Sequence, residues 1–186
     1  MKKKINEIAD VSLGAPITRI SKRYDGVKEE REVLYCKVDE FYTKKEKIAV
    51  DIDEKYLTKN GDVIFKLTSP QTAICINESN KISEGVVVSS KFVIIKPQNV
   101  DSVFLAELLN SNIAKNQFYK FSEGIIKQIK IKDLEKIEFE IPSLEEQKKC
   151  VKSIKLINKE INIEEQLIEE NKNLKEVLIR KTQGVN

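Results

Sequence analysis

An acidic residue two positions before a lysine is the pattern in this sequence that comes nearest to catalytic chemistry. Asp53-Glu54-Lys55 matches the acid-x-Lys half of a nuclease metal site, in which carboxylates bind a divalent cation. Charged residues make up 34% of the chain, so such a triplet is expected by chance. A nuclease is therefore a minor alternative, and we expect no catalytic residue and no metal site.

Other catalytic signals are absent from the sequence. It contains no histidine, which is the usual general base near neutral pH, and it has neither a glycine-rich phosphate loop nor a G-x-S-x-G elbow. Cys36, Cys75 and Cys150 lie far apart, and an odd number of cysteines fits neither a disulfide framework nor a zinc site. We expect them to be small buried apolar residues in a binding protein that is not an enzyme.

A change in composition near Pro142 divides the chain into two predicted parts. Residues 1–141 contain nearly all the glycines and every aromatic residue, and they predict a globular α+β domain. Residues 142–186 have no further proline and no aromatic residue, and they predict one long helix. The fold class is therefore a mixed domain followed by a long C-terminal coiled-coil helix.

The domain's elements are predicted from apolar periodicity and turn residues. A helix capped by Asp101 or Ser102 is expected over 103–119, and a short helix or turn over 5–11. Segments with strand character cover 33–38, 63–66, 73–76 and 86–95. The last segments of the domain are expected at 125–131, 132–134 and 137–141.

The C-terminal helix has clear signals at both ends. Ser143 and Glu146 form a capping box at its start, and Gly184 follows its last periodic residues. About 39 residues at ~1.5 Å each give a rod of roughly 58 Å.

The apolar residues of this helix recur at steps of three and four, interrupted by polar residues, which is typical of an imperfect coiled-coil seam. We predict that this seam contacts a second helix; folding back onto the chain's own domain is the alternative. The seam residues are Val151, Ile154, Ile157, Ile161, Ile168, Leu174 and Leu178.

Charge and hydropathy limit the remaining function classes. The 33 basic and 30 acidic residues leave a net charge of +3, so any contact with nucleic acid has to come from a local patch. The Lys-rich start is followed by acidic residues instead of an apolar stretch, and no run reaches the length of a membrane span. We expect a cytoplasmic protein without a membrane partner.

The order of several motifs resembles the specificity (S) subunits of type I restriction–modification systems. Residues 4–14 look like the leading helix and Gly-bearing loop that open a target-recognition domain, and 57–65 are similar to its Leu, Gly-Asp and apolar-strand element. Residues 122–137 resemble its later Gly, Ile and acidic-Leu run. The junction Ile141-Pro142-Ser143-Leu144-Glu145-Glu146-Gln147, followed by a long helix, is the most diagnostic piece.

The resemblance implies a non-catalytic subunit that reads one half of a bipartite DNA site. S-adenosylmethionine and ATP would then belong to the methyltransferase and restriction subunits that assemble on it. Subunits of this family generally carry two recognition domains and two helical spacers, so this chain resembles a half-subunit, either natural or a fragment. A homodimer through the helix would favour an interrupted palindromic target.

Base reading requires polar side chains on the loops of the domain, as when Arg contacts guanine or Gln contacts adenine. The first candidate DNA contacts follow the Gly14 loop: Thr18, Arg19, Lys22, Arg23 and Tyr24. Three further groups are Lys66, Thr68, Ser69 and Gln71; Ser89, Ser90 and Lys91; and Ser122, Lys127 and Gln128. Two alternatives stay open: a coiled-coil module that binds protein, and a regulatory half-subunit that competes for methyltransferase partners.

Overall fold

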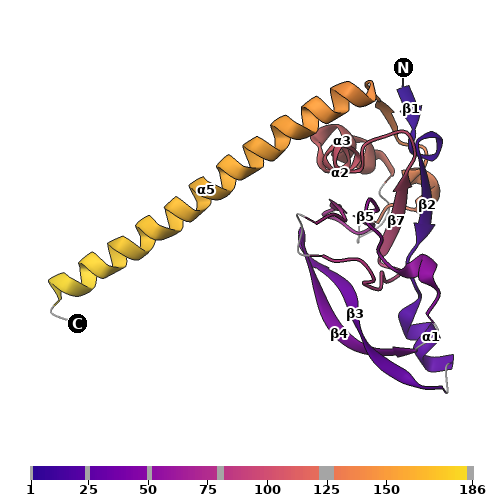
Figure 1. Ribbon diagram of the computed structural model, residues 1–186, viewed down its shortest axis with the longest axis horizontal. Coiled ribbons are helices and arrows are strands. Elements are labelled where there is room, and N and C mark those ends of the chain that lie inside the picture. Colours follow the sequence, from indigo (N-terminus) through magenta and orange to yellow (C-terminus); the bar gives the residue numbers. More distant parts are fainter. Residues whose placement is uncertain (1, 24–25, 50–51, 79–81, 122–127, 184–186) are drawn as a thin grey trace. The chain divides into compact units, whose positions relative to one another are not determined.

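The computed structural model describes residues 2–23, 26–49, 52–78, 82–121 and 128–183. The chain forms two compact units, Met1–Gln147 and Lys148–Asn186 (Figure 1). The first unit contains both sheets and helices, and the second consists mainly of one helix. The predicted α+β domain with a long C-terminal helix is confirmed.

A four-stranded antiparallel sheet lies at the centre of the first unit, with strand order β2-β7-β5-β6. Its strands are β2 (Ala9–Leu13), β7 (Phe92–Pro97), β5 (Val63–Lys66) and β6 (Ala73–Cys75). The central strands β5 and β7 are almost continuous runs of buried residues, because both faces of the sheet are covered.

One face of the sheet packs against helices. Val63 and Phe65 of β5 and Val93 and Ile95 of β7 point to this side and belong to the largest apolar core. The helices that contribute to this core are α2 (Ser102–Asn110), α3 (Asn112–Phe121) and α4 (Ile131–Leu134). The ring centroids of Phe65 and Phe118 lie 5.2 Å apart, which joins the sheet to α3.

A long hairpin contributes to the opposite core. Strands β3 (Lys28–Lys37) and β4 (Glu40–Ala49) pair antiparallel, and both are labelled in Figure 1. Leu34 and Phe41 of the hairpin share a second apolar core with Ile64 and Ile94 of the sheet. The strand expected over 33–38 covers only the second half of β3, and β4 was not predicted, because lysine and glutamate interrupt its apolar alternation.

Three other expectations need correction. The segment 5–11 is a 3-10 turn, η1 (Ile5–Glu7), followed by strand β2, and the short helix α1 (Ile17–Arg23) was not predicted. The strand expected over 86–95 begins only at Phe92, because Val87 forms isolated bridges to two other segments. In the segment 125–131, residues 125–127 lie outside the described residues, Gln128 forms an isolated bridge to Thr68, and Ile131 begins α4.

The helix expected over 103–119 is two helices. Its predicted cap is confirmed, since the Asp101 carboxylate accepts hydrogen bonds from the amides of Val103 and Phe104. The break falls at Ser111, whose hydroxyl donates to the Leu108 carbonyl at 2.6 Å. A side chain that bonds its own backbone in this way competes with helical hydrogen bonding.

Side-chain amides on the helices complete the hydrogen bonding of two strands. The side-chain oxygen of Asn110 accepts a hydrogen bond from the Ala73 backbone amide at 2.8 Å. The side-chain nitrogen of Asn110 donates to the Ala73 carbonyl at 2.9 Å. Gln117 does the same for Glu138 in β8 (Glu138–Glu140), which pairs with β1 (Lys2–Lys4). Both amides act as a neighbouring strand would, so α2 and α3 are tied to strand edges.

Helix α5 (Leu144–Thr182) begins where the sequence predicted. Ser143 Oγ donates to the Glu146 carboxylate at 2.7 Å, and the Ser143 backbone amide donates to it at 2.9 Å. These bonds lower the pKa of Glu146. The capping box is therefore confirmed.

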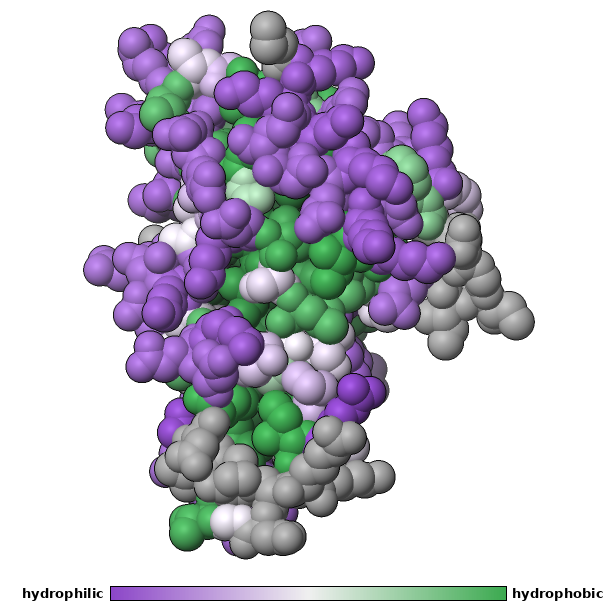
Figure 2. Space-filling view, turned by 90° about the vertical axis from the view of Figure 1, so that its right-hand side faces the viewer, coloured by the Kyte–Doolittle hydropathy of each residue, from purple (hydrophilic) through white to green (hydrophobic). Residues whose placement is uncertain are grey.

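The face of the molecule drawn in Figure 2 is mostly polar. Figure 2 shows one face on which hydrophilic residues dominate, with hydrophobic residues gathered in its central area. This agrees with a chain in which one third of the residues are charged and the two signs nearly balance.

Candidate nucleic-acid interface

The strand ends of the central sheet bring distant loops to one place. Leu13 of β2 and Phe65 of β5 both lie opposite Val93 of β7, and Phe65 also lies opposite Ala73 of β6. The segment after β2, the turn before β7 and the loop between β5 and β6 therefore leave the sheet at the same end. We call this the loop end of the sheet.

A tight backbone crossing builds the first part of the loop end. Ala15 donates its amide to the Val88 carbonyl at 2.7 Å, and Ser90 donates its amide to the Ala15 carbonyl at 2.8 Å. A Cβ atom on Gly14 would lie 2.3 Å from the Ser89 carbonyl oxygen, so a side chain at this position would displace backbone. Glycine is required here for close approach.

This crossing joins two of the predicted DNA-binding groups. Thr18 and Arg19 are exposed in the first turn of α1. Together with Pro16, Ile17 and Ser90 they line a surface cavity of about 410 Å³. Two residues with hydroxyl side chains and one arginine thus line the same surface cavity.

The other two groups meet the same end of the sheet through backbone contacts. Thr68 and Gln128 form an antiparallel bridge, and the Ile129 amide donates to the Leu67 carbonyl at 3.1 Å. The Leu67 amide in turn donates to the Lys91 carbonyl at 3.3 Å. Residues from the second, third and fourth groups are therefore neighbours.

Members of the second group differ in access to solvent. Ser69 is exposed, whereas Lys66 is only 6% exposed and donates its ammonium to the Val38 carbonyl at the hairpin turn. Lys66 thus has little access to a phosphate backbone. Gln71 lies half-buried in the loop between β5 and β6.

Some predicted contacts cannot be placed on this surface. Lys22 and Arg23 belong to α1, but the structure does not describe their side chains. Tyr24, Ser122 and Lys127 lie outside the described residues.

The hairpin carries an aromatic pair that the sequence analysis did not single out. The rings of Tyr35 and Tyr42 stack at 5.7 Å between centroids, and the Lys44 ammonium lies 5.6 Å and 5.5 Å from them. The Tyr35 hydroxyl donates to the Glu46 carboxylate, which raises the pKa of Tyr35 to about 12. Sequence reasoning could not pair the two rings because it did not predict β4; the hairpin register of the structure places Tyr35 opposite Tyr42.

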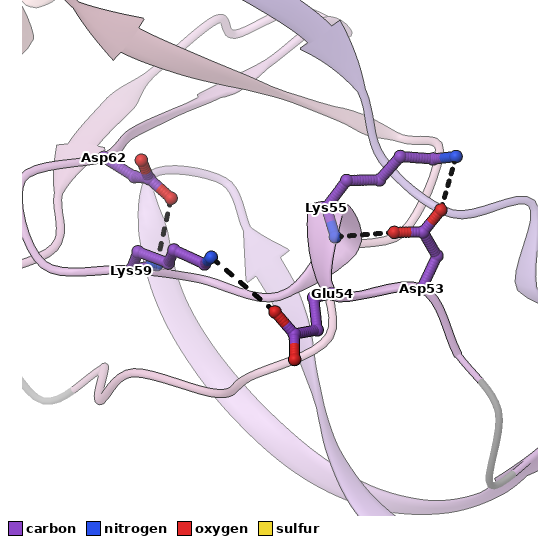
Figure 3. A network of polar contacts seen from close by, with 5 residues as sticks. All are labelled: Asp53, Glu54, Lys55, Lys59 and Asp62. Carbon is purple, nitrogen blue, oxygen red and sulfur yellow. Dashed lines mark hydrogen bonds and ion pairs between the residues drawn. The ribbon is translucent and has the colours of Figure 1, made fainter.

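The acid-x-Lys triplet is a capped turn (Figure 3). The Asp53 carboxylate accepts the Lys55 backbone amide at 3.0 Å and pairs with the Lys55 ammonium at 2.6 Å, and both contacts lower the pKa of Asp53. Asp53 is thus the N-cap of the 3-10 turn η2 (Glu54–Tyr56). In the described part of the chain, no group of acidic, histidine or cysteine residues is arranged to hold a metal ion.

The Gly-Asp element next to this turn has a structural role. The Asp62 carboxylate accepts the Lys59 amide at 2.9 Å, which closes a turn that contains Gly61 at φ 86° (Figure 3). Burial raises the pKa of Asp62. A glycine followed by a turn-closing aspartate therefore leads the chain directly into β5.

A family profile described as type I restriction modification DNA specificity domain matches residues 1–173. The chain belongs to this family. The match covers the candidate interface, the junction at Pro142 and most of α5.

Solved structures share the fold of this specificity domain. A chain from a structure described as the basis of complex assembly and conformational transition of the type I R-M system matches with a TM-score of 0.70 at 16% identity, over 98% of this chain and 48% of its own length. The HsdS subunit from Thermoanaerobacter tengcongensis matches with a TM-score of 0.66 at 17% identity. The match covers 97% of this chain and 47% of the HsdS chain. The type I restriction-modification S subunit from M. genitalium matches with a TM-score of 0.60 at 14% identity. This match covers 93% of this chain and 42% of the S subunit chain.

The specificity domain and its helix span about half the length of these structural relatives. No curated protein sequence matches the chain.

Helix α5 of this specificity domain carries the predicted seam. Val151 is buried and Ile154 is half-buried near the start of the helix. The other five seam residues are between 46% and 56% exposed: Ile157, Ile161, Ile168, Leu174 and Leu178. Branched apolar side chains thus recur along the exposed length of α5.

Two further observations on the specificity domain concern its cysteines and the hydropathy of its helices. All three cysteines are free, but only Cys75 is buried, while Cys36 is half-buried and Cys150 is exposed. The expectation of three buried cysteines is therefore wrong for Cys150. No helix among the described residues has the length and apolar character needed to cross a membrane.

Proposed function

We propose that this chain recognises one half-site of a bipartite DNA sequence on behalf of a type I restriction–modification complex. The observation that carries the proposal is the loop end of the sheet, where members of all four predicted groups come together although they lie up to about 110 residues apart in sequence. Membership of the DNA specificity domain family supports the same role.

The dimensions and chemistry of the loop end suit a DNA groove. Four strands at ~4.8 Å spacing span roughly 14 Å, close to the ~12 Å width of the major groove. Arg19 carries the fork of donors that suits the guanine edge, while the hydroxyls of Thr18 and Ser90 suit phosphate oxygens. We assign base reading to Arg19 and positioning to the two hydroxyls.

The long helix supports assembly as a homodimer. Its exposed seam leaves apolar surface that a second copy of α5 would cover, and the chain has about half the length of its structural relatives. A two-fold dimer would present two identical readers to an interrupted palindrome.

Catalysis would then belong to other subunits. We propose that methyltransferase and restriction subunits, with their S-adenosylmethionine and ATP, assemble on this chain, and that the chain itself performs no reaction. The contacts of Asp53 support this, because its carboxylate already accepts the Lys55 backbone amide and forms an ion pair with the Lys55 ammonium.

Replacement of Arg19 tests the proposal. Arg19→Ala should lower affinity for the preferred duplex about tenfold or more and relax selectivity at one base pair, whereas the matched variant Arg180→Ala on α5 should leave the preference unchanged. Duplexes selected from a random library by the wild-type chain provide the reference. Equal retention of all duplexes by the wild-type chain would contradict DNA recognition and would favour a protein-binding module, for which the exposed seam of α5 is the supporting feature.

A further inference from the structure

The first part of α5 carries a row of lysines along one side of the helix. Residues 148–159 contain five lysines and no acidic residue. Four of them recur at steps of four, three and four, which at ~100° per residue places them in a stripe roughly 60° wide. We call these exposed residues the lysine stripe: Lys148, Lys152, Lys155 and Lys159.

The lysine stripe and the apolar seam lie on different sides of α5. At ~100° per residue, Ile157 and Ile161 of the seam lie about half a turn around the helix from the middle of the stripe. A second copy of α5 that covers the seam would therefore leave the lysines accessible. The stripe has to be explained by another partner.

Neighbouring lysines of the stripe repel one another. Lys152, Lys155 and Lys159 have no acidic residue three or four positions away along α5, and each has another lysine there instead. Lys172, farther along the helix, has the opposite arrangement, with its ammonium 3.4 Å from the Glu169 carboxylate. Like charges at these spacings destabilise a helix, whereas opposite charges stabilise it. An external polyanion would remove the repulsion within the stripe.

The length and spacing of the lysine stripe suit a row of phosphates. About 11 residues at ~1.5 Å each give roughly 16 Å from Lys148 to Lys159, and each DNA strand carries one phosphate per ~3.4 Å of helix axis. A stripe of this length therefore matches about five phosphates of one strand. A lysine ammonium binds phosphate as a point charge, and phosphate contacts carry no base information directly.

We propose that the lysine stripe binds the phosphate backbone of duplex DNA, as a contact that is independent of base sequence and separate from the loop end. The inference rests on the proposed function, because a chain that recognises DNA supplies the stripe with a polyanion. The contact adds affinity and salt dependence but no selectivity. Residues 160–170 contain five glutamates and no basic residue, so favourable contact with phosphates ends near Lys159.

The salt dependence of DNA binding by the full-length chain tests this assignment. The stripe variant combines Lys152→Gln, Lys155→Gln and Lys159→Gln. In fluorescence anisotropy between about 50 and 200 mM salt, the slope of log affinity against log salt should become shallower by about 2–3, because each phosphate contact contributes ~0.9. All duplexes should lose a similar factor of affinity, about 10- to 100-fold at low salt, and the consensus selected from a random library should stay unchanged.

Two further variants separate a local effect from a general one. The matched control combines Lys172→Gln, Lys175→Gln and Lys181→Gln, which removes the same charge from α5 outside the stripe, and its slope should stay close to that of the wild-type chain. Arginine at the three stripe positions keeps the charge and should keep the wild-type slope. Glutamine and arginine are both strong helix formers, so circular dichroism should show an intact α5 in every variant.

Other outcomes overturn the inference. Equal slopes in the stripe and control variants would show that the stripe makes no phosphate contact of its own. If the wild-type chain still selected a consensus, the proposed function would stand, and an acidic protein surface would be favoured as the partner of the stripe. A slope that depends on the stripe in a chain that retains all duplexes equally would support the stripe and contradict half-site recognition. A wild-type chain that binds no DNA would contradict both.

Discussion

The backbone amide of Asp101 donates a 2.8 Å hydrogen bond to the side-chain oxygen of Gln147. Gln147 is 1% exposed, and its side-chain nitrogen donates to the Pro142 carbonyl at 2.8 Å. Since Asp101 also caps α2, one buried amide connects the start of α2 to the first turn of α5. The Gln of the Pro142 junction therefore has a structural role within the first unit, where it links α2 to the residues that begin α5.

Removal of this amide should destabilise the first unit. Gln147→Ala leaves the Asp101 amide and the Pro142 carbonyl without their partner, so we expect the free energy of unfolding to fall by about 1–3 kcal/mol. Urea denaturation followed by circular dichroism measures the change. Gln166→Ala, at an exposed position of α5, is the matched control, and an equal effect of both variants would contradict the role of Gln147.

A methyl group at Gly14 should damage the loop end. Gly14→Ala places Cβ against the Val88 and Ser89 carbonyl oxygens, and we expect a loss of about 1–3 kcal/mol in stability together with weaker DNA binding. Gly85→Ala is the comparison, since Gly85 has open space around it but a φ of +80°. It should cost about 1 kcal/mol in stability through its backbone conformation and leave DNA binding unchanged. The same loss of DNA binding in both variants would argue against a local effect at Gly14.

Charges in the α5 seam should prevent dimer formation without unfolding the domain. Ile161 and Ile168 are 46% and 55% exposed, so Ile161→Asp with Ile168→Asp removes no core contact within the chain. Analytical ultracentrifugation should show a dimer for the wild-type chain and a monomer for this variant. Lys155→Asp with Lys159→Asp controls for added negative charge on exposed positions of the same helix. A wild-type monomer at micromolar concentration would contradict pairing through α5.

Alkaline pH should weaken the hairpin through Tyr35. Its pKa rises from 10.0 to about 12 in the folded chain, first because its hydroxyl donates to Glu46 and then because of burial. The folded chain therefore keeps this proton at pH values where the unfolded chain releases it. This contribution is complete below pH 10 and is lost as the pH rises to about 12.

Ultraviolet absorbance of tyrosinate should show one late titration that Tyr35→Phe removes. The Tyr35→Phe chain should also lose less stability between pH 10 and 12 than the wild-type chain. Tyr119→Phe, at a position that is 71% exposed, is the matched control. The raised pKa would be contradicted if Tyr35→Phe removed tyrosinate absorbance near pH 10 and left the rest of the titration unchanged.

Features set by neighbours in sequence were predictable. The start of α5 depends on Ser143 and Glu146, three residues apart, and the start of α2 depends on Asp101 and the next few amides. Both were predicted correctly because a helix cap is a local interaction. The break at Ser111 was missed because serine is common in helices as well as in caps, and only the observed bond to Leu108 separates the two cases.

The candidate interface depended on both sequence and tertiary structure. Residue type alone indicated which polar side chains suit DNA, and the order of motifs indicated the family. Only the sheet register brings Thr18 and Arg19 beside Ser90, places Thr68 against Gln128, and turns Lys66 inward. These contacts join residues about 60 to 70 positions apart or depend on which face of a strand is covered, and neither property is encoded in a local pattern.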